Sequence, residues 1–546
     1  MATAIRVENY GEVFTRRWVV DAILDLVGYS ADSDLAAGTV VEPSCGTGAF
    51  LGPVVERLLA SAQRTGVAYE KLGSCIQAFD LQQSHVDDAR ALAAEALRLD
   101  GCEFALADRL AEQWVQCADY LLDDTSLSAD WVVGNPPYIR IEDLNPEIAA
   151  EYRSRWSTMN GRADIYVPFF ERSLLALRPG GRLGFICADR WFRNSYGAAL
   201  RRLVSDGFAV QHIWTMHDVD AFASEVSAYP AITVLAATPQ GEVTVLDTDA
   251  TFGPGFAPAA AKWALGTETT STSTGFRGHR LPQWFSGDGF WPTGTPARLS
   301  LIEHLTDRFP SLEDKTTGTK VGIGIATGAD QAYILKDPEV VEAERALPLV
   351  VGSDLNSGTF VWGNHYLANV WESDGRLVDL AEYPRLESQL IGYAEGLKGR
   401  HTAKKNLANW HRTIDKVNHA LLDRPLLMMR DLGATANPVL VPAGYYPHHN
   451  VYWVSSDVWD LEVLGGLMLS RVAQAFIEAY CVRMRGGTLR FQAQYLRQIR
   501  VPDPSSLAPG VEAELRQAFR DRDADLATTA SCTAFGINPT EYELDG

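Results

Sequence analysis

Residues 40–51 have the sequence VVEPSCGTGAFL, which is a short apolar strand, an acid at its end, a glycine-bearing turn and the start of a helix. Gly46 and Gly48 would let the backbone approach a ligand closely, which a Cβ would prevent. Glu42 closes the strand where a cationic or hydroxylated group of a ligand could lie. Many structural strand–helix turns look similar, so this turn alone leaves ligand binding open.

The chain from Val40 to about Leu246 alternates short apolar strands with amphipathic stretches such as 84–99 and 164–177. This alternation predicts a parallel, doubly wound α/β sheet. Ligands of such sheets bind at the carboxyl ends of the strands. The expected strands are TVVEP (39–43), SCIQAFD (74–80), CEFALAD (102–108), DWVVGNPP (130–137), GRLGFICA (181–188), VQHIWTM (210–216) and AITVLAA (231–237).

Two of these expected strands end in an aspartate directly after an apolar run. A carboxylate at the end of the second strand, Asp80, suits the two ribose hydroxyls of a nucleoside. A carboxylate at the end of the third, Asp108, suits an adenine amino group. Both residues could instead be helix N-caps, which aspartate favours. Ligand binding is the favoured interpretation for Asp80, and both interpretations stay open for Asp108.

The stretch WVVGNPPYIR (131–140) indicates a reaction at an amino group of a base. It is a buried strand that ends in Asn135, Pro136, Pro137 and Tyr138, and the two prolines make the segment stiff. An adenine amino group is a poor nucleophile because its lone pair is delocalised into the ring. Hydrogen bonds from that group to the Asn135 side-chain oxygen and the Pro136 carbonyl would strengthen as positive charge develops on the nitrogen. Tyr138 offers a face on which a flipped base can stack.

These motifs resemble those of γ-class N6-adenine DNA methyltransferases of type II restriction–modification systems, similar to the TaqI methylase and its longer relatives. The resemblance implies a Rossmann-like domain that uses S-adenosyl-L-methionine, followed by a mixed α/β target-recognition domain. GEVFT (11–15) resembles the cofactor-clamp segment, although Arg16 follows where a proline is common. Phe222 would be a second aromatic residue against the flipped base. The implied cofactor residues are Thr15, Glu42, Pro43, Gly46, Gly48, Asp80, Asp108 and Phe169, of which Phe169 could equally be a core aromatic.

Composition shifts predict four segments along the chain. Residues 1–250 form the catalytic domain, and 251–299, rich in Gly, Ser, Thr and Pro, form a linker. Residues 300–510 form the target-recognition domain. Residues 511–546 form a charged helix and an acidic tail.

The net charge of -21 is unusual for a protein that binds nucleic acid, but binding needs only a local basic patch. Two basic stretches are candidates: LKGRHTAKKNLANWHRTIDK (397–416) and RMRGGTLR (483–490). A solvated helix face and a simple hairpin, respectively, are the structural alternatives. The predicted DNA contacts are Lys398, Arg400, Lys404, Lys405, Trp410, Arg412, Arg483, Arg485 and Arg490.

Several protein classes are disfavoured by what the sequence lacks. No run of about eighteen apolar residues and no signal core is present, so we expect a cytoplasmic protein rather than a membrane or secreted one. The seven cysteines are scattered, without a CxxC pair or zinc-ligand spacing. They are therefore expected to be free thiols, and no metal is implied.

Other acceptors and roles remain open. Asn-Pro-Pro-Tyr also occurs in enzymes that methylate glutamine amides in proteins, and similar motifs occur in RNA methyltransferases. The long basic, aromatic-bearing region after the motif favours double-stranded DNA over RNA or protein. An inactive DNA-recognition subunit is disfavoured because the catalytic tetrapeptide and cofactor acids are present. Since about ten residues precede the clamp segment, we expect a stand-alone methylase whose restriction endonuclease, if it has one, is a separate protein. We also expect the methylase to be a monomer.

Overall fold

The computed structural model describes residues 14–216, 219–223, 230–404, 406–483 and 488–545. It divides into two compact units, Met1–Trp291 and Pro292–Gly546. The division falls inside the stretch 251–299 that the sequence predicts to be a linker. Among the described residues, no helix combines the length and the apolar composition that a membrane span requires.

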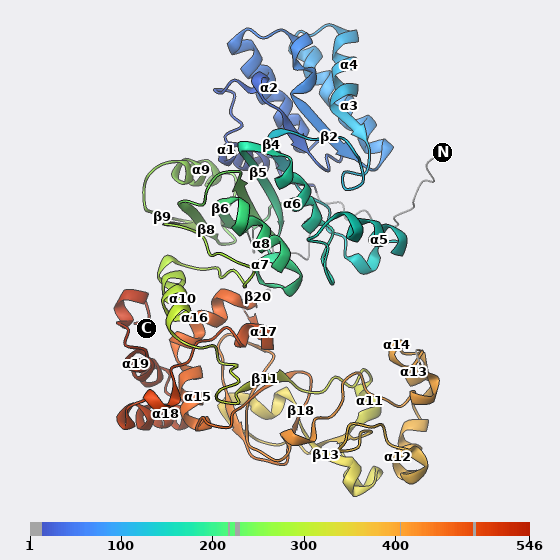
Figure 1. Ribbon diagram of the computed structural model, residues 1–546, viewed down its shortest axis with the longest axis vertical. Coiled ribbons are helices and arrows are strands. Elements are labelled where there is room, and N and C mark those ends of the chain that lie inside the picture. Colours follow the sequence, from blue (N-terminus) through green and yellow to red (C-terminus); the bar gives the residue numbers. More distant parts are fainter. Residues whose placement is uncertain (1–13, 217–218, 224–229, 405, 484–487, 546) are drawn as a thin grey trace. The chain divides into compact units, whose positions relative to one another are not determined.

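The first unit is built on a ten-stranded sheet with the order β3-β2-β1-β4-β5-β7-β6-β8-β10-β9 (Figure 1). Its first five strands in this order are parallel, as the alternating pattern predicts. Strand β7, however, is antiparallel to both β5 and β6, so the sheet is not parallel throughout. The strands are β1 (Val40–Glu42), β2 (Ile76–Asp80), β3 (Val115–Cys117), β4 (Ala129–Gly134), β5 (Leu177–Ala188), β6 (Ala209–Thr215), β7 (Pro230–Ala236), β8 (Val243–Thr248), β9 (Thr270–Ser273) and β10 (Phe276–Leu281).

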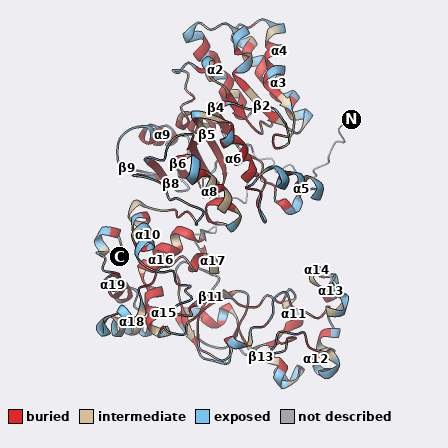
Figure 2. Cartoon of the chain, in the orientation of Figure 1, coloured by how far each residue is buried: buried red, intermediate tan, exposed pale blue. Residues whose placement is uncertain are grey.

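Both faces of the sheet are covered, which explains why its central strands are mostly apolar rather than alternating between apolar and polar residues. Neighbouring strand residues belong to different cores: Val40 and Val133 to one, Val41 and Val132 to the other. The central strands are accordingly buried (Figure 2). The helices of this unit are α1 (Arg17–Leu26), α2 (Leu51–Thr65), α3 (Gln83–Leu99), α4 (Phe104–Trp114), α5 (Pro146–Arg155), α6 (Tyr166–Leu175), α7 (Arg190–Arg193), α8 (Ala198–Gly207) and α9 (Ala257–Leu265).

The strand expected over 102–108 is wrong, because these residues lie at the start of helix α4. The Glu103 carboxylate caps the helix by accepting hydrogen bonds from the backbone amides of Ala105 and Leu106, 3.1 and 3.0 Å away. The buried residues of the helix recur at helical rather than strand spacing, at Ala107, Leu110, Ala111 and Trp114. The third strand of the sheet, β3, follows the helix.

The stretch 251–299 is not a loose linker. It contains helix α9 and strands β9 and β10, and β10 pairs antiparallel with β8 along its whole length. The polar Ser- and Thr-rich run at 270–273 is strand β9, at the edge of the sheet, where its side chains are mostly exposed. An edge strand needs no apolar face, so its composition resembles that of a loop.

The second unit is mixed α/β, as the resemblance implies. Two four-stranded sheets have the orders β11-β19-β15-β17 and β12-β14-β13-β18, and a three-stranded sheet has the order β16-β21-β20. The strands are β11 (Lys320–Ile323), β12 (Ile334–Leu335), β13 (Ala346–Val350), β14 (His365–Ala368), β15 (Leu426–Arg430), β16 (Leu432–Gly433), β17 (Val439–Val441), β18 (Tyr446–Pro447), β19 (Val451–Ser455), β20 (Val482–Arg483) and β21 (Leu489–Arg490).

The described residues at the C-terminal end of the chain pack into this unit. Helices α18 (Pro509–Asp521) and α19 (Ala524–Phe535) pack on each other and on α15 (Leu461–Leu469). The apolar sides of the two C-terminal helices are buried there. The remaining helices are α10 (Pro296–Arg308), α11 (Asp330–Tyr333), α12 (Pro384–Ile391), α13 (Ala394–Gly399), α14 (His401–Lys404), α16 (Arg471–Tyr480) and α17 (Ala493–Leu496).

Candidate active site

A cavity of about 550 Å³ lies at the carboxyl ends of the parallel strands of the first unit. Residues at or just after the ends of β1, β2, β3 and β4 line it together, as the topology of a doubly wound sheet requires. The sequence-predicted residues that line the cavity are Thr15, Glu42, Pro43, Gly46, Asp80, Asn135, Pro137, Tyr138 and Phe169.

Glu42 presents a buried carboxylate to this cavity. The residue is 3% exposed, and its Oε2 atom has no hydrogen-bond partner among the described residues. Burial raises the pKa of Glu42 well above its usual range, and the nearby Asp80 carboxylate raises it further. A carboxyl group in this situation is stabilised by a cationic group of a ligand, which would supply the missing partner.

Asp80 and the glycine turn form the neighbouring wall. The Asp80 carboxylate accepts hydrogen bonds from the Gly46 amide at 3.0 Å and the Gln82 amide at 2.9 Å. Gly46 has φ +51°, and a Cβ built there would point into open space, so glycine keeps this part of the cavity free. Gly48, with φ +101°, does not line the cavity but allows the turn into α2.

The acid after the third strand is Asp119 rather than the predicted Asp108. Asp108 lies on α4, where its side chain is half-exposed and forms an ion pair with Arg98, and it does not line the cavity. Asp119 follows β3 by two residues and lines the cavity. Its carboxylate accepts hydrogen bonds from the Tyr152 hydroxyl at 2.7 Å and the Leu121 amide at 2.9 Å. Burial nevertheless raises the pKa of Asp119.

Phe169 lies in an aromatic wall of the cavity. Its ring stacks on that of Tyr120, with centroids 5.3 Å apart and 28° between the planes. Tyr120 in turn meets Phe79 edge-on at 5.5 Å. Phe169 is 6% exposed, so this side chain belongs to the core and also lines the cavity.

Asn135 is positioned from two sides. Its Nδ2 atom lies 3.2 Å from the hydroxyl oxygen of Thr15, to which it donates, and its backbone carbonyl accepts a hydrogen bond from Ser44 at 3.1 Å. Thr15 belongs to the clamp segment, so this segment holds the amide of the tetrapeptide. Pro136, next in the chain, is buried and is not among the cavity-lining residues.

Phe222 lies beside Tyr138. The two rings meet edge-on with centroids 6.3 Å apart. Phe222 is held there because residues 14–16 pair antiparallel with residues 221–223, through an isolated bridge between Thr15 and Phe222. The hydroxyl of Tyr138 is buried without a hydrogen-bond partner in the described chain, and burial raises its pKa well above the usual range. The ring of Tyr138, rather than its hydroxyl, therefore faces the cavity.

Sequence reasoning missed the opposite wall of the cavity. It is formed by the loop after the tetrapeptide and by helix α5, and its residues include Ile139, Leu144, Asn145, Ile148 and Tyr152. The signal for Asp119 and Tyr120 was present as an acid–aromatic pair directly after the short strand VQC (115–117), but it is hidden once the third strand is placed too early.

Comparison with known proteins decides the family. The model of the Eco57I restriction-modification methylase family matches residues 93–222. The type II methyltransferase M.XhoI of Xanthomonas vasicola is 40% identical over 98% of this chain and 99% of its own length. M.PaeR7I of Pseudomonas aeruginosa is 40% identical over 100% of this chain and 95% of its own.

The chain belongs to the type II methyltransferases of restriction–modification systems. Its fold also matches the solved structure of the type IIL restriction-modification enzyme MmeI in complex with DNA, with a TM-score of 0.60 and 12% identity over 96% of this chain and 74% of that one.

The cavity of this methyltransferase fits S-adenosyl-L-methionine, the methyl donor of these enzymes. The buried Glu42 carboxylate suits a cationic ammonium group, and the Asp80 carboxylate suits ribose hydroxyls. Gly46 leaves room beside them, and the Phe169 ring offers a face for a purine. Each of these features is a property of the described side chains, so the fit does not depend on the family name.

In the second unit of the methyltransferase, one predicted DNA contact, Arg400, forms several hydrogen bonds within the unit. The Arg400 guanidinium donates to the carbonyl oxygens of Thr327, Trp410 and Arg412 at 3.0, 3.0 and 2.8 Å. It also bonds the hydroxyl of Tyr333 at 3.3 Å. Arg400 therefore ties loops of the unit together.

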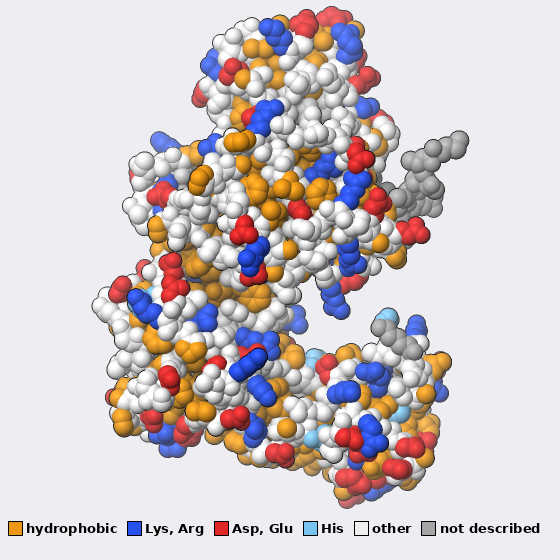
Figure 3. All heavy atoms as spheres, viewed as in Figure 1, with side chains coloured by type: hydrophobic (Ala, Val, Ile, Leu, Met, Phe, Trp, Pro, Cys, Tyr) orange, Lys and Arg blue, Asp and Glu red, His pale blue; other side chains and the backbone are white. Residues whose placement is uncertain are grey.

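The other basic residues of 397–416 are more accessible. Lys398 and Lys404 are exposed, and the Lys398 ammonium lies 5.2 Å from the centre of the Trp410 ring. Arg412 lies over the Trp371 ring at 5.8 Å. On the face drawn in Figure 3, basic side chains of this unit are mixed with acidic ones. Arg490 is exposed on β21, whereas Lys405, Arg485 and the Arg483 side chain lie outside the described residues.

Proposed function

We propose that this methyltransferase transfers the methyl group of S-adenosyl-L-methionine to the exocyclic N6 of an adenine in a short duplex DNA sequence. The methylation protects host DNA from a cognate restriction endonuclease. The observation that supports this most is the position of Asn135, Pro137 and Tyr138, which line the same cavity as Glu42 and Asp80. A donor site and an amino-group acceptor site thus share one enclosed space.

The tetrapeptide supplies the acceptors for the reacting amino group. When bound, the cofactor offers an electrophilic methyl group on a sulfonium. The Asn135 side-chain oxygen accepts one N6 hydrogen. The Pro136 carbonyl, although Pro136 does not line the cavity of the ligand-free protein, is the acceptor we propose for the other, and the two bonds localise the nitrogen lone pair. The hydrogen bond from Asn135 Nδ2 to Thr15 orients the amide before the substrate arrives. Such preorganised groups act mainly on the transition state, where the nitrogen becomes positive.

The neighbouring aromatic rings suit a base that has left the duplex. Tyr138 and Phe222 lie edge to face within 6.3 Å, at the tetrapeptide. A flipped adenine stacks on the Tyr138 ring, and Phe222 supports that ring from its side. For the cofactor, Asp119 takes the role that the sequence assigned to Asp108, because it is the acid that lines the cavity after β3.

We further propose that the endonuclease is a separate protein and that the methyltransferase acts as a monomer. Relatives named as methyltransferases alone align with this chain over 95% and 99% of their length. Light scattering after size-exclusion chromatography, with and without DNA, tests the monomer.

The function is tested by expressing the chain in a host without adenine methylation and mapping N6-methyladenine at single-base resolution. We expect methylation of one adenine within one short motif. Unmodified adenine together with cytosine methylation would refute the adenine assignment. Unmodified DNA from a purified protein that still binds S-adenosyl-L-methionine would instead indicate an RNA or protein acceptor.

A further inference from the structure

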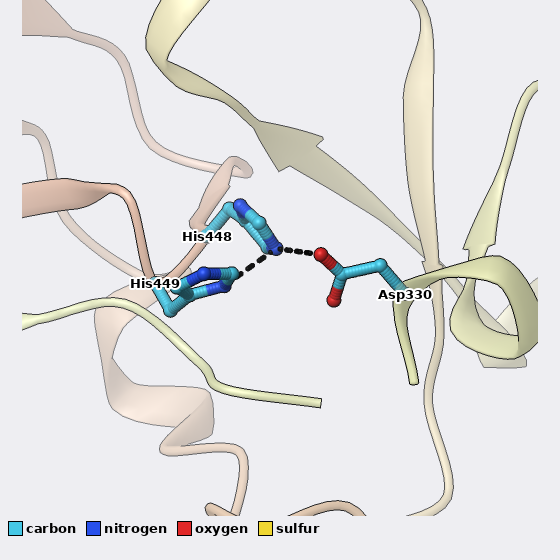
Figure 4. A group of neighbouring side chains, drawn as sticks. All are labelled: Asp330, His448 and His449. Atoms are coloured by element: carbon cyan, nitrogen blue, oxygen red, sulfur yellow. Dashed lines mark hydrogen bonds and ion pairs between the residues drawn. The ribbon is translucent and has the colours of Figure 1, made fainter. Parts of the chain in front are cut away.

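Three potential metal ligands meet in the second unit: an aspartate and an adjacent pair of histidines that is distant from it in sequence. His448 Nε2 lies 3.3 Å from Asp330 Oδ2 and 2.9 Å from His449 Nδ1, and all three ligand atoms lie within 4.8 Å of one another (Figure 4). Asp330 begins helix α11, and the two histidines follow β18 directly. His448 is 4% exposed, His449 is exposed and Asp330 is half-exposed.

The hydrogen bonds around His448 define which of its nitrogens carries a proton. The Gly352 amide donates to Asn450 Oδ1 at 3.2 Å, so the Asn450 atom at this position is the acceptor oxygen. The same oxygen lies 2.9 Å from His448 Nδ1, which must therefore carry a hydrogen and donate it. The other ring nitrogen, Nε2, points toward Asp330 and His449. In a metal-binding histidine, the ring nitrogen that does not bind the metal usually donates a hydrogen bond of this kind to an oxygen acceptor.

The Nε2 atom of His448 and the Oδ2 atom of Asp330 lie 3.3 Å apart, a spacing that a shared cation would bridge. Around a tetrahedral zinc ion with bonds of about 2.0–2.1 Å, adjacent ligand atoms are roughly 3.3 Å apart. The separations of 3.3 and 2.9 Å are close to this spacing, so little movement is needed to admit the ion. Two imidazoles and a carboxylate suit zinc, whereas calcium and magnesium prefer oxygen ligands.

The backbone holds both histidines in place without any ion. The His448 amide donates to the Val350 carbonyl at 2.9 Å, and the His449 amide donates to the Ile325 carbonyl at 3.0 Å. On the other side, the Thr327 hydroxyl donates to the second oxygen of Asp330, Oδ1, which leaves Oδ2 directed at His448. These contacts fix the ligand atoms in a converging arrangement, which lowers the entropic cost of binding an ion.

We propose that Asp330, His448 and His449 form a zinc site in the second unit. The ion joins the start of α11 to the turn between β18 and β19, and water completes its coordination on the side where Asp330 and His449 are exposed. The scattered cysteines gave no sign of such a site, because its ligands are a single aspartate and an adjacent histidine pair 118 positions apart, from 330 to 448.

The test uses the full-length, tag-free protein, stripped with a chelator and dialysed. Cobalt(II), a spectroscopic substitute for zinc, is titrated into wild type, His449→Ala, Asp330→Asn and His401→Ala. His401 is an exposed histidine of the same unit and serves as the matched control. We expect wild type and His401→Ala to bind about one zinc or cobalt per chain, with a visible absorption typical of a tetrahedral or five-coordinate site. His449→Ala and Asp330→Asn should bind at least about tenfold more weakly.

Zinc should also raise the melting temperature of wild type and His401→Ala but not of the two ligand variants. S-adenosyl-L-methionine binding, a property of the other unit, and circular dichroism check that each variant is folded. Wild type that takes up no zinc or cobalt would overturn the proposal and leave a histidine–aspartate ion pair. Equal uptake by His449→Ala, Asp330→Asn and wild type would also overturn it, because the metal would then be bound elsewhere.

Discussion

The two units of this methyltransferase differ in how far their candidate site residues can be identified from sequence motifs. In the first unit, the proposed site residues lie at the ends of strands β1, β2 and β4, and the sheet brings them to one cavity. In the second unit, basic residues are spread over loops and short helices, and Arg400 is used to hold the unit together. A catalytic motif specifies both the type of each residue and its position in the fold. A basic stretch specifies only the charge of its residues and not which of them contact DNA.

The largest effect should come from the tetrapeptide. Asn135→Ala removes an acceptor that acts mainly in the transition state, so we expect kcat for DNA methylation to fall by about 10²–10³-fold or more. Binding of S-adenosyl-L-methionine, measured by calorimetry, should stay within a few-fold of wild type. Thr15→Val, which removes the hydroxyl beside Asn135 Nδ2, should lower kcat less, and Thr15→Ser should restore it. Loss of cofactor binding in step with activity would contradict the role given to Asn135.

The next comparison separates the two candidate acids for the cofactor. Asp119→Asn should raise the Kd for S-adenosyl-L-methionine by roughly 10- to 100-fold, since a hydrogen bond to a charged group contributes about 1.5–3 kcal/mol. Asp108→Asn is the matched control and should leave Kd unchanged, because Asp108 lies outside the cavity. A result in which Asp108→Asn weakens binding and Asp119→Asn does not would restore the sequence-based assignment.

Much of the first unit's fold could be predicted from local pattern because its buried strands are short, mostly apolar runs. The prediction failed at 102–108, where Glu103 caps a helix that carries the same apolar residues. It failed at 251–299, where an edge strand is polar. In the second unit, strands of two to five residues carry too little pattern to be recognised. The partners of Arg400 come from positions 327–412, which no local pattern connects.

A third prediction concerns stability without ligand. Because burial raises the pKa of Glu42, the folded chain holds a proton that the unfolded chain releases above its ordinary pKa near 4.5. The contribution of Glu42 therefore lowers the free energy of unfolding of the ligand-free protein as pH rises from 4.5 toward the raised pKa of the folded state. Above that pKa the free energy of unfolding falls no further on account of Glu42. Glu42→Gln should raise the melting temperature at pH 7–8 while weakening S-adenosyl-L-methionine binding by about tenfold or more.

Calorimetry of Glu42→Gln and of Glu95→Gln, an exposed control on α3, at several pH values checks this. The difference in melting temperature between Glu42→Gln and wild type should grow with pH, and the control should show none. A variant that is less stable than wild type at every pH would mean that Glu42 is ionised and paired in the ligand-free protein.

The smallest effects belong to the second unit, where Arg400→Ala and Lys404→Ala distinguish a structural cation from a DNA contact. Arg400→Ala leaves several carbonyl oxygens without a donor, so we expect the free energy of unfolding of this unit to fall by about 1–3 kcal/mol. Lys404→Ala should leave stability unchanged, because the side chain is exposed. It should weaken DNA binding only a few-fold and lower the slope of log K against log salt by about one.

The slope of log K against log salt distinguishes the roles of Arg400 and Lys404. Weaker DNA binding alone does not, since a partly unfolded unit also binds DNA less well. Arg400→Ala should show the wild-type slope at temperatures where the variant is folded. If Arg400→Ala instead lowers the slope by about one without a change in melting temperature, the guanidinium must leave its carbonyl partners and contact a phosphate when DNA binds. In that case the basic stretch 397–416 would have identified a DNA-contacting residue correctly, as the strand-end motifs identified cavity residues in the first unit.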